Sequence, residues 1–455
     1  MKIHIYLLVF LLFMMDETSA QSIKPRFNLI MGSNGVSLGK INGMTRDRYG
    51  IMWFSDQDNH CITRYDGTIM TRFAHDPKNP NTLGGWYPEC IFADSTGIIW
   101  IGFTGMGLDR FDPATNHFTH FRHHPNDSES LANNVVSAVL MDHLGNLWAG
   151  TDGGLDLLDQ KSGKFKHFRN QPNDSTSLSY NKVRSIYEDH EGRLWVGAAD
   201  QWENNDKGGL NLFHRETNRF TCYLNDPKNS HSLINNKVRA MFEDSRGNFW
   251  VGTGGDGLHT MDRKTGSFER HTYDPAHPEA LSRPPLRSSF DHITFITEDA
   301  GGAIWIGTMA NGLNRYDTAT KKITHFGNNA DGSGTFRDNS GWWANASGDG
   351  LIWISTQEAH LYRVDIFTNY FPAFETGFSG TNAFYQEEPD VIWLGTVNGL
   401  IRKNNRDGSF RRFTNESTDS GYTGINSIFG IIKDKQGDFL INSIGGISRF
   451  NPNTG

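Results

Sequence analysis

Tryptophan recurs along the chain at a nearly regular interval, and this repeat limits the possible folds more than any other feature. The series is Trp53, Trp100, Trp148, Trp195, Trp250, Trp305, Trp353 and Trp393, and Leu440 takes the equivalent place in a last copy. A period of roughly 20 to 50 residues is typical of repeat architectures, in which each unit buries its apolar faces against its neighbours. The 455-residue chain therefore contains nine copies of one unit.

Each full copy has the pattern of four short strands. In the third copy we expect strands over residues 134–142, 146–151, 154–159 and 164–168. An Asp-x-x-Gly turn separates the first two strands, because Asp caps its own backbone and Gly accepts the positive φ at the end of the turn. The turn recurs at Asp47/Gly50, Asp94/Gly97, Asp142/Gly145, Asp189/Gly192, Asp244/Gly247, Asp299/Gly302 and Asp434/Gly437, whereas Ser347/Gly350 and Glu387/Asp390 depart from it.

Four antiparallel strands with an aromatic residue fixed in the second strand are typical of a β-propeller blade. The composition agrees, since 49 Gly and 12 Trp in a chain that is 36% hydrophobic indicate many short strands and tight turns. We therefore predict an all-β fold: a β-propeller of four-stranded antiparallel blades with nine blade-like repeats, each tryptophan acting as a wedge between adjacent blades. Nine copies exceed the roughly four to eight blades of one propeller, so we favour one seven-bladed propeller plus the start of a second.

The copies resemble the two-component regulator propeller repeats over residues 41–455. The pattern of that family, Asp-x-x-Gly-x-x-Trp-x-Gly-Thr followed by Gly-Leu, is visible in "DHLGNLWAGTDGGL", "DSRGNFWVGTGGDGL" and "DAGGAIWIGTMANGL". The resemblance implies the periplasmic sensor region of a hybrid two-component receptor, many of which detect oligosaccharides. It also implies an input role in signal transduction, and a homodimer is one arrangement that the receptor family suggests.

The predicted domain organisation starts with a signal peptide over residues 1–20, in which Lys2 precedes an apolar run and "TSA" precedes Gln21. We expect the seven-bladed sensor propeller over residues 21–372 and repeats eight and nine over residues 373–455. Residues 26–30, "RFNLI", resemble a fourth strand without a blade of its own. Either they close the ring, or the chain is the front portion of a longer receptor, and we favour the second alternative.

Charge and composition exclude several functional classes. The net charge of −8 is spread along the chain without a Lys/Arg block, so we expect no nucleic-acid partner. After the signal peptide no segment is apolar enough to span a membrane. The three cysteines match neither a disulfide framework nor a zinc site, and we expect no metal and no cofactor.

Catalysis is the main competing interpretation, because some propellers cleave polysaccharides. No nucleophile motif or acid and base spacing is evident, so we predict that the chain is not an enzyme. A propeller lyase or hydrolase stays open as an alternative, with an acid and base drawn from His271, His277, His292, Glu279 and Asp291. A protein-binding scaffold is the third possibility.

Strand order divides the loops between two faces of the propeller. The turn face carries the turns between strands one and two and between strands three and four, whereas the loop face carries the loops between strands two and three and the connections between blades. The loop face varies most, so we expect the ligand there. Its longest interval runs from Trp195 to Leu210 and contains Trp202, Glu203 and Asn205, an aromatic ring beside groups that could bind sugar hydroxyls.

A second set of candidates lies five residues before each turn aspartate, on the strand expected to line the central channel. Here the predicted ligand-binding residues are Glu89, Arg184, Arg239 and Trp342, with Trp86, Tyr87 and Trp343 adjacent. Arg184 and Arg239 could together hold a carboxylate, which favours an acidic oligosaccharide as the partner. An internal Arg–Glu network that fills the channel is the alternative.

Overall fold

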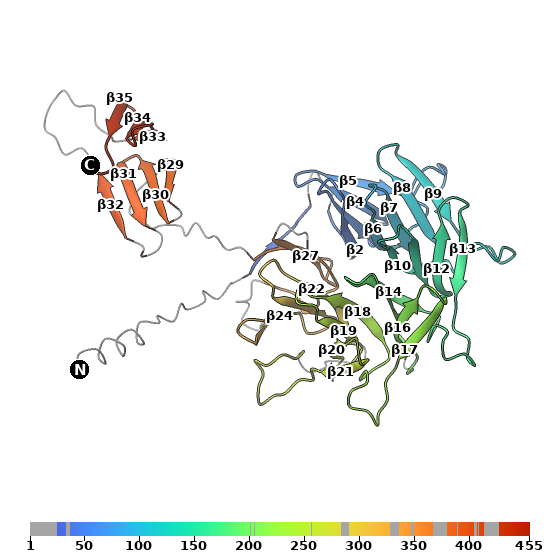
Figure 1. Ribbon diagram of the computed structural model, residues 1–455. Coiled ribbons are helices and arrows are strands. Elements are labelled where there is room, and N and C mark those ends of the chain that lie inside the picture. The colour runs from blue at the N-terminus through green and yellow to red at the C-terminus, as the bar shows by residue number, and fades with distance from the viewer. Residues whose placement is uncertain are drawn as a thin grey trace, which may run out of the picture. The chain divides into compact units, whose positions relative to one another are not determined.

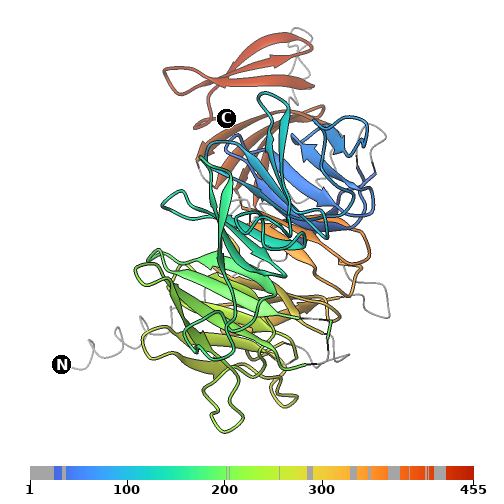
Figure 2. The same ribbon diagram turned by 90° about the vertical axis from the view of Figure 1, so that its right-hand side faces the viewer.

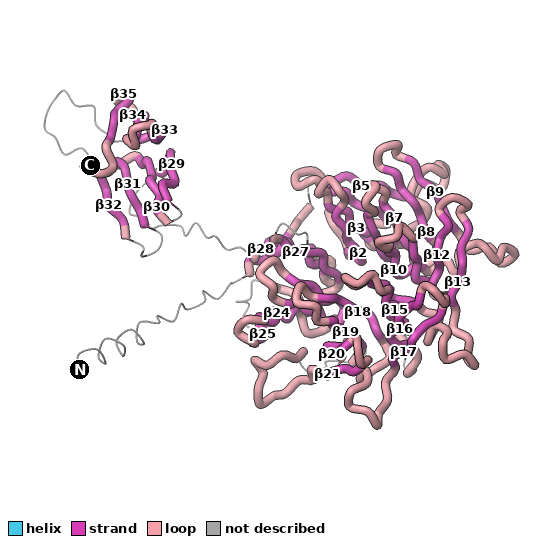
Figure 3. Tube along the Cα trace, in the orientation of Figure 1, coloured by secondary structure: helices cyan, strands magenta, loops and turns pink. Residues whose placement is uncertain are grey.

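The computed structural model describes residues 25–32, 37–200, 202–203, 205–255, 257–283, 291–327, 336–346, 350–366, 380–388, 390–404, 407, 409–413 and 427–455. The predicted signal peptide lies outside these residues. The chain divides into two compact units, Met1–Thr368 and Asn369–Gly455. Every described segment is a strand or a loop (Figure 3). The prediction of an all-β chain is therefore confirmed.

The first unit contains seven four-stranded sheets, which we number as blades in chain order. Blades one to three consist of β2 (Ile41–Arg46), β3 (Met52–Asp56), β4 (Cys61–Tyr65), β5 (Met70–Ala74), β6 (Pro88–Ala93), β7 (Ile99–Phe103), β8 (Leu108–Asp112), β9 (His117–Phe121), β10 (Val136–Met141), β11 (Leu147–Thr151), β12 (Gly154–Asp159) and β13 (Lys164–Phe168). Blades four to six consist of β14 (Val183–Glu188), β15 (Leu194–Ala199), β16 (Gly208–His214), β17 (Arg219–Tyr223), β18 (Val238–Glu243), β19 (Phe249–Thr253), β20 (Leu258–Asp262), β21 (Ser267–Arg270), β22 (Ile293–Glu298), β23 (Ile304–Thr308), β24 (Leu313–Asp317) and β25 (Lys322–Phe326).

Blade seven closes the ring with a strand from the other end of the unit. It contains β26 (Trp343–Ala346), β27 (Leu351–Ser355) and β28 (Leu361–Asp365), and its fourth strand is β1 (Arg26–Leu29), which pairs antiparallel with β28. The first strand of each blade contacts the first strand of the next, and β26 contacts β2. The sheets follow one another in chain order from blue to brown (Figures 1 and 2). Residues 26–29 thus close the ring, while the other alternative, a front portion of a longer receptor, stays a prediction.

The second unit holds blades eight and nine. They consist of β29 (Thr381–Glu388), β30 (Val391–Thr396), β31 (Gly399–Asn404), β32 (Phe410–Phe413), β33 (Ile428–Lys433), β34 (Phe439–Ser443) and β35 (Gly446–Phe450). Trp393 packs between the two sheets against Ile428 and Phe439. The nine repeats are therefore nine sheets of one propeller type.

The tryptophans lie between successive sheets, as the repeat predicts. Trp148 of blade three packs against Val183 and Leu194 of blade four, and Trp195 packs against Val238 and Phe249 of blade five. The same relation continues around the ring to Trp353 of blade seven, which packs against the first blade. The wedge interpretation is confirmed.

A hydrogen bond that the motif alone did not reveal joins six of the turn aspartates to the tryptophan six residues later. Trp148 Nε1 donates to Asp142 Oδ2 at 2.7 Å, while Asp142 Oδ1 accepts the backbone N–H groups of Leu144 and Asn146. Glu387 keeps the bond to Trp393 at 2.8 Å in blade eight, where the aspartate is replaced. The other bonds of this kind join Trp53, Trp100, Trp195, Trp250 and Trp305 to their own turn aspartates at 2.8–3.0 Å.

Buried polar residues near the start of the third strand hold the connections between blades. Asn211 donates its amide to Val196 O and accepts the backbone N–H of Ser179. His259 does the same one blade later, since Nδ1 faces Val251 O at 3.2 Å and Nε2 accepts the N–H of Ile234 at 3.0 Å. The connections are thereby fixed as scaffold beneath the loop face.

Because β1 closes the ring, we expect the free energy of unfolding to depend on Phe27. This side chain is 9% exposed and packs against Trp305 and Phe336 of the closing seam. Phe27→Ala should lower the free energy of unfolding by about 3–5 kcal/mol, as measured by urea denaturation. Arg26→Ala, at an exposed position of the same strand, should change it by less than about 0.5 kcal/mol. Equally small effects of both variants would contradict ring closure.

His259 predicts a defined acid sensitivity. Burial lowers the pKa of His259 to about 4, and the side chain is fully enclosed. Between about pH 6.5 and 4 the unfolded chain therefore binds a proton that the folded chain does not, so stability falls as the pH drops through this window, by up to about 3 kcal/mol.

The matched variant is His259→Asn, because Asn211 and Asn314 occupy the corresponding positions of blades four and six. Asparagine does not titrate, so the variant should lose less unfolding free energy than the parent between pH 7 and 4.5. The measurement is urea denaturation at both pH values. Identical losses in the two proteins would show that His259 is not the titrating group.

Candidate functional site

A β-bulge in the first strand of eight blades creates the predicted row of channel residues. In each of these strands the pairing register with the second strand omits one residue, and a bulge of this kind re-aims a side chain away from the regular ladder. The omitted residues are Asn42, Glu89, Ser137, Arg184, Arg239, Thr294, Asn382 and Phe429. In blade seven Trp342 precedes β26 and donates its N–H to Ser355 O. The position next to the apolar core is therefore produced by the backbone bulge of the blade.

Side chains from three blades join in one hydrogen-bonded chain at the mouth of the channel. Trp342 Nε1 donates to Asn42 Oδ1 at 3.0 Å, and Asn42 Nδ2 donates to Glu89 Oε2 at 2.9 Å. Thr104 Oγ1 donates to the same carboxylate oxygen at 3.2 Å. The structure thus brings together Glu89 and Trp342, which were predicted from separate repeats.

Trp342 also carries two cations. The Arg239 guanidinium and the Lys40 ammonium each lie 4.3 Å from the centre of its ring. Because Trp342 is only 4% exposed, it positions these cations and offers no open face for stacking. Trp343 is half-buried and packs against the core that Trp353 forms with blade one.

Burial affects the pKa of both cations. Burial lowers the pKa of Arg239 to about 10, with Glu89 opposing the shift and Arg184 adding to it. Burial also lowers the pKa of Lys40, and Glu89 and Asp58 oppose that shift. Arg239 is therefore positively charged at neutral pH, and both groups are poorly hydrated.

Arg184 already has hydrogen-bond and ion-pair partners close to it. Its Nη1 lies 2.6 Å from Ser137 Oγ and 3.0 Å from a carboxylate oxygen of Asp152, and its Nε donates to Ala199 O. Arg184 and Arg239 interact electrostatically, as expected for neighbouring blades, but Arg184 already has a carboxylate partner.

Trp86 and Tyr87 form an exposed aromatic platform between blades one and two. Their side chains are 45% and 48% exposed, and they directly precede β6, which carries Glu89. Imidazole rings brace them nearly edge-on: His75 lies 4.8 Å from Trp86, and His60 lies 4.9 Å from Tyr87, measured between ring centres. The Trp86 carbonyl also contacts His60 Nδ1 at 2.8 Å. The two rings are therefore both accessible and held in place.

The long interval of blade four lies on the loop face, where strand order places it. Trp202 is 52% exposed, and its ring lies 6.3 Å from that of His292. Asn205 Nδ2 donates to Glu203 Oε2 at 2.8 Å, and the Glu203 carbonyl accepts from Lys237 of blade five. Trp202 is the most exposed of the aromatic residues described on this face. Gln201 and Asn204 lie outside the described residues.

Lysines two residues before the bulge are a part of the site that the sequence pattern contained but that our reasoning missed. Lys40, Lys182 and Lys237 precede Asn42, Arg184 and Arg239 by the same interval. Lys182 binds Asp200, and it lies 3.6 Å from Glu203 Oε1. Comparing this one position across the copies would have identified them.

Two of the residues considered for catalysis, Asp291 and His277, have structural partners. Asp291 pairs with the fully buried Arg283 and accepts from Asn311, and His277 pairs with Asp274 in an exposed connection. Arg283 thus supports its loop from inside, and Arg287 lies outside the described residues. Within the described ranges, no group of three or more His, Cys, Asp or Glu side chains could hold a metal ion, and no helix could cross a membrane.

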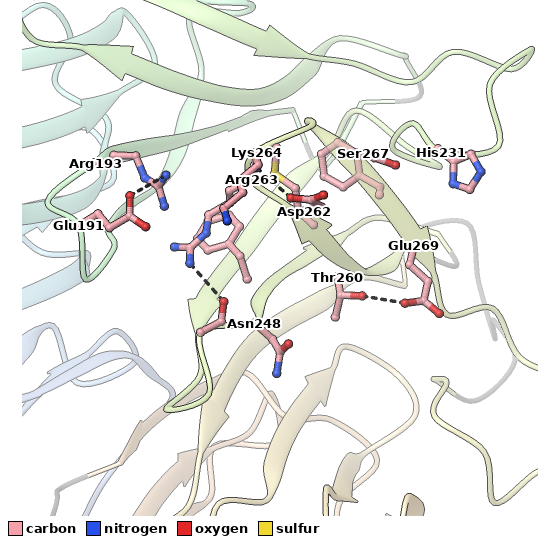
Figure 4. A pocket seen from close by; sticks show the side chains of 14 residues that line it. Glu191, Arg193, His231, Asn248, Thr260, Asp262, Arg263, Lys264, Ser267 and Glu269 are labelled. Carbon is pink, nitrogen blue, oxygen red and sulfur yellow. Dashed lines mark hydrogen bonds and ion pairs between the residues drawn. The ribbon is translucent and has the colours of Figure 1, made fainter.

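A cleft of about 450 Å³ lies at blades four and five, lined mainly by residues of the turn face (Figure 4). Its two arginines are already paired: Arg193 with Asp189 and Glu191, and Arg263 with Asp189 and Glu243. None of the ten predicted ligand-binding residues lines this cleft. The pair between Arg263 and Asp189 joins blades five and four and thereby supports the ring.

Comparison with a family model clarifies the nature of the repeats. Residues 130–153, 177–200 and 232–255 match the model described as two component regulator propeller. These segments are two component regulator propeller repeats. They span the connection, first strand, turn and tryptophan strand of blades three, four and five.

Solved structures resemble the regulator propeller fold of this chain. The extracellular domain of BT3049 from B. thetaiotaomicron, described as a hybrid two component system, is similar with a TM-score of 0.60 and 20% identity over 95% of this chain and 54% of that one. The extracellular domain of BT4673 from the same organism gives 0.56, 20%, 94% and 53%. The chain spans about half the length of these structures.

Propellers of other description are similar too. PorZ of Porphyromonas gingivalis, a surface component of the type-IX secretion system, has a TM-score of 0.56 and 16% identity over 92% of this chain and 60% of that one. Virginiamycin B lyase from Staphylococcus aureus gives 0.53, 14%, 75% and 99%. At these identities the likeness shows the fold alone. A comparison with curated proteins found no match.

The exposures predict a simple spectroscopic signature for the candidate face. Of the 12 tryptophans, Trp86 and Trp202 are the two with exposures of 45% or more. Acrylamide should therefore quench mainly these two, and Trp86→Phe with Trp202→Phe should remove most of the quenchable fluorescence. The control is Trp148→Phe at a buried wedge position. Unchanged quenching in the double variant would show that both rings are covered.

Proposed function

We propose that this regulator propeller is an exported ligand-binding sensor that recognises an oligosaccharide, as the input module of a two-component signalling system. The observation that carries the proposal is the presence on one face of Trp86, Tyr87 and Trp202, exposed rings beside amides, carboxylates and cations. Aromatic rings stack on the apolar C–H face of a pyranose, and neighbouring polar groups bind its hydroxyls.

The cellular setting belongs to the same proposal. Export through the predicted signal peptide would place the propeller in the periplasm, where it could meet oligosaccharides. The similar structures from B. thetaiotaomicron are extracellular domains, and one is described as part of a hybrid two component system. A homodimer, by analogy with the receptor family, stays a prediction.

The arrangement favours binding without cleavage. Glu89 is engaged by Asn42 and Thr104, and the acid and base candidates near His277 and Asp291 are held in structural pairs. Trp86, Tyr87 and Trp202 stay exposed on the loop face, and their rings supply contact area.

A panel of neutral and acidic oligosaccharides tests the proposal. Isothermal calorimetry should detect binding of at least one member, and chromatography of the mixture should recover it intact. New reducing ends or unsaturated products would instead show a glycan-cleaving propeller. No heat with any member would favour the protein-binding scaffold.

Trp202→Ala tests the location. It should weaken the affinity for the bound member by roughly 1–3 kcal/mol, the scale of losing an aromatic anchor. The matched control is Leu144→Ala, an exposed apolar residue in a turn on the other face, which should leave the affinity unchanged. An unchanged affinity in Trp202→Ala would place the ligand elsewhere.

A further inference from the structure

One aromatic ring at the mouth of the channel gathers charges from distant parts of the chain. Arg239 comes from the bulge of β18, Lys40 precedes β2, and both lie 4.3 Å from the ring of Trp342. Blades five, seven and one thus contribute to one cluster. Lys40 and Arg239 interact electrostatically with each other, each opposing the charge of its neighbour.

Glu89 is one nearby negative charge that acts on both Lys40 and Arg239. Its Oε2 accepts from two neutral donors, Asn42 and Thr104. Asp58 also acts on Lys40 but is exposed to water, whereas Arg184 acts on Arg239 with the same sign of charge.

Water compensates these charges poorly. Both cations lie against the indole, and burial is the largest influence on the protonation of each. A poorly hydrated cation gains more from an incoming anion than an exposed one does, because less water must be displaced and the local dielectric constant is lower. Both residues are partly exposed, so a ligand group can reach them.

We propose that the oligosaccharide carries an anionic group, a carboxylate or a sulfate, and that Arg239 and Lys40 bind it while Trp342 positions them. This inference rests on the proposed function and names its ligand class. It replaces the pairing of Arg239 with Arg184 that the sequence suggested, because Arg184 is already engaged by Asp152. The Trp86 and Tyr87 platform, which adjoins β6, is placed to contact a neighbouring ring.

The test uses pairs of oligosaccharides that differ only in charge. The carboxylate arm compares tetragalacturonate with its methyl ester, and the sulfate arm compares a carrageenan oligosaccharide with its desulfated form. With the full chain, calorimetry should show that the charged member of one pair binds about tenfold tighter or more. This preference should shrink between about 50 and 200 mM NaCl.

Three variants assign the preference to the cluster. Arg239→Gln and Lys40→Met should each remove most of the preference and leave the affinity for the neutral member unchanged. Glu89→Gln should act in the opposite direction and strengthen binding of the charged member, because it removes the competing carboxylate. Lys264→Gln, at an exposed turn-face position, is the matched change of net charge without effect. If Arg239→Gln fails to fold, Glu89→Gln and Lys40→Met decide.

The outcomes separate this inference from the function on which it rests. Equal affinity for charged and neutral members would overturn the anion site and leave oligosaccharide binding intact. A charge preference that survives in Arg239→Gln and Lys40→Met would overturn the assignment to these residues. No binding by any member of either arm would overturn the proposed function itself.

Discussion

Burial of tryptophan between successive sheets is the interaction on which the whole structure depends. An aromatic side chain of this size removes roughly 150–250 Å² from water, which corresponds to roughly 4–6 kcal/mol at the usual coefficient. The turn aspartate satisfies the indole N–H, so the ring is buried without leaving a polar group unpaired. Because the same pair recurs around the ring, each blade is fixed against the next in one orientation.

That uniformity separates the two faces. The turn face is committed to the scaffold, since its aspartates cap turns, bind tryptophans and pair with arginines of the following blade, as Arg215 does with Asp142. On the loop face, the described residues above the connections do not make this repeated set of scaffold contacts. There the bulge in the first strand of eight blades re-aims one side chain, and sequence variation at that single position changes the chemistry of the mouth without disturbing the core.

The fold was predictable because it rests on repetition, and the site was predictable only in part. The tryptophan interval and the Asp-x-x-Gly turn gave the strands, the wedge role and the sorting of loops, since these follow from local patterns repeated many times. The prediction that Glu89, Arg184 and Arg239 lie near the axis came from a position that recurs five residues before the turn on the first strand of each blade. Their partners could not be predicted in this way, because Lys40 and Trp342 are about 300 residues apart and meet only when the ring closes. The sequence indicated that residues 26–30 form a strand, but it did not identify β28 as the strand with which β1 pairs.

Position within the ring explains why some aromatic residues differ in role despite similar surroundings in the sequence. Trp342 occupies an axial position and is buried under two cations, whereas Trp86 lies in a connection and stays exposed. In the sequence, both tryptophans lie near polar residues, and their roles can be distinguished only in the closed ring. In the proposed function, Trp342 positions the cations and Trp86 contacts the ligand.

Hydrogen exchange of the full chain with a bound oligosaccharide tests most directly whether the loop face is the ligand face. The predicted result is slowed backbone exchange in residues 39–43, 86–90, 182–185, 202–208 and 237–240, with the turns unchanged. Protection confined to the turn-face segments 189–193, 244–248 and 262–267 would contradict the assignment and place the ligand in the cleft on the opposite side.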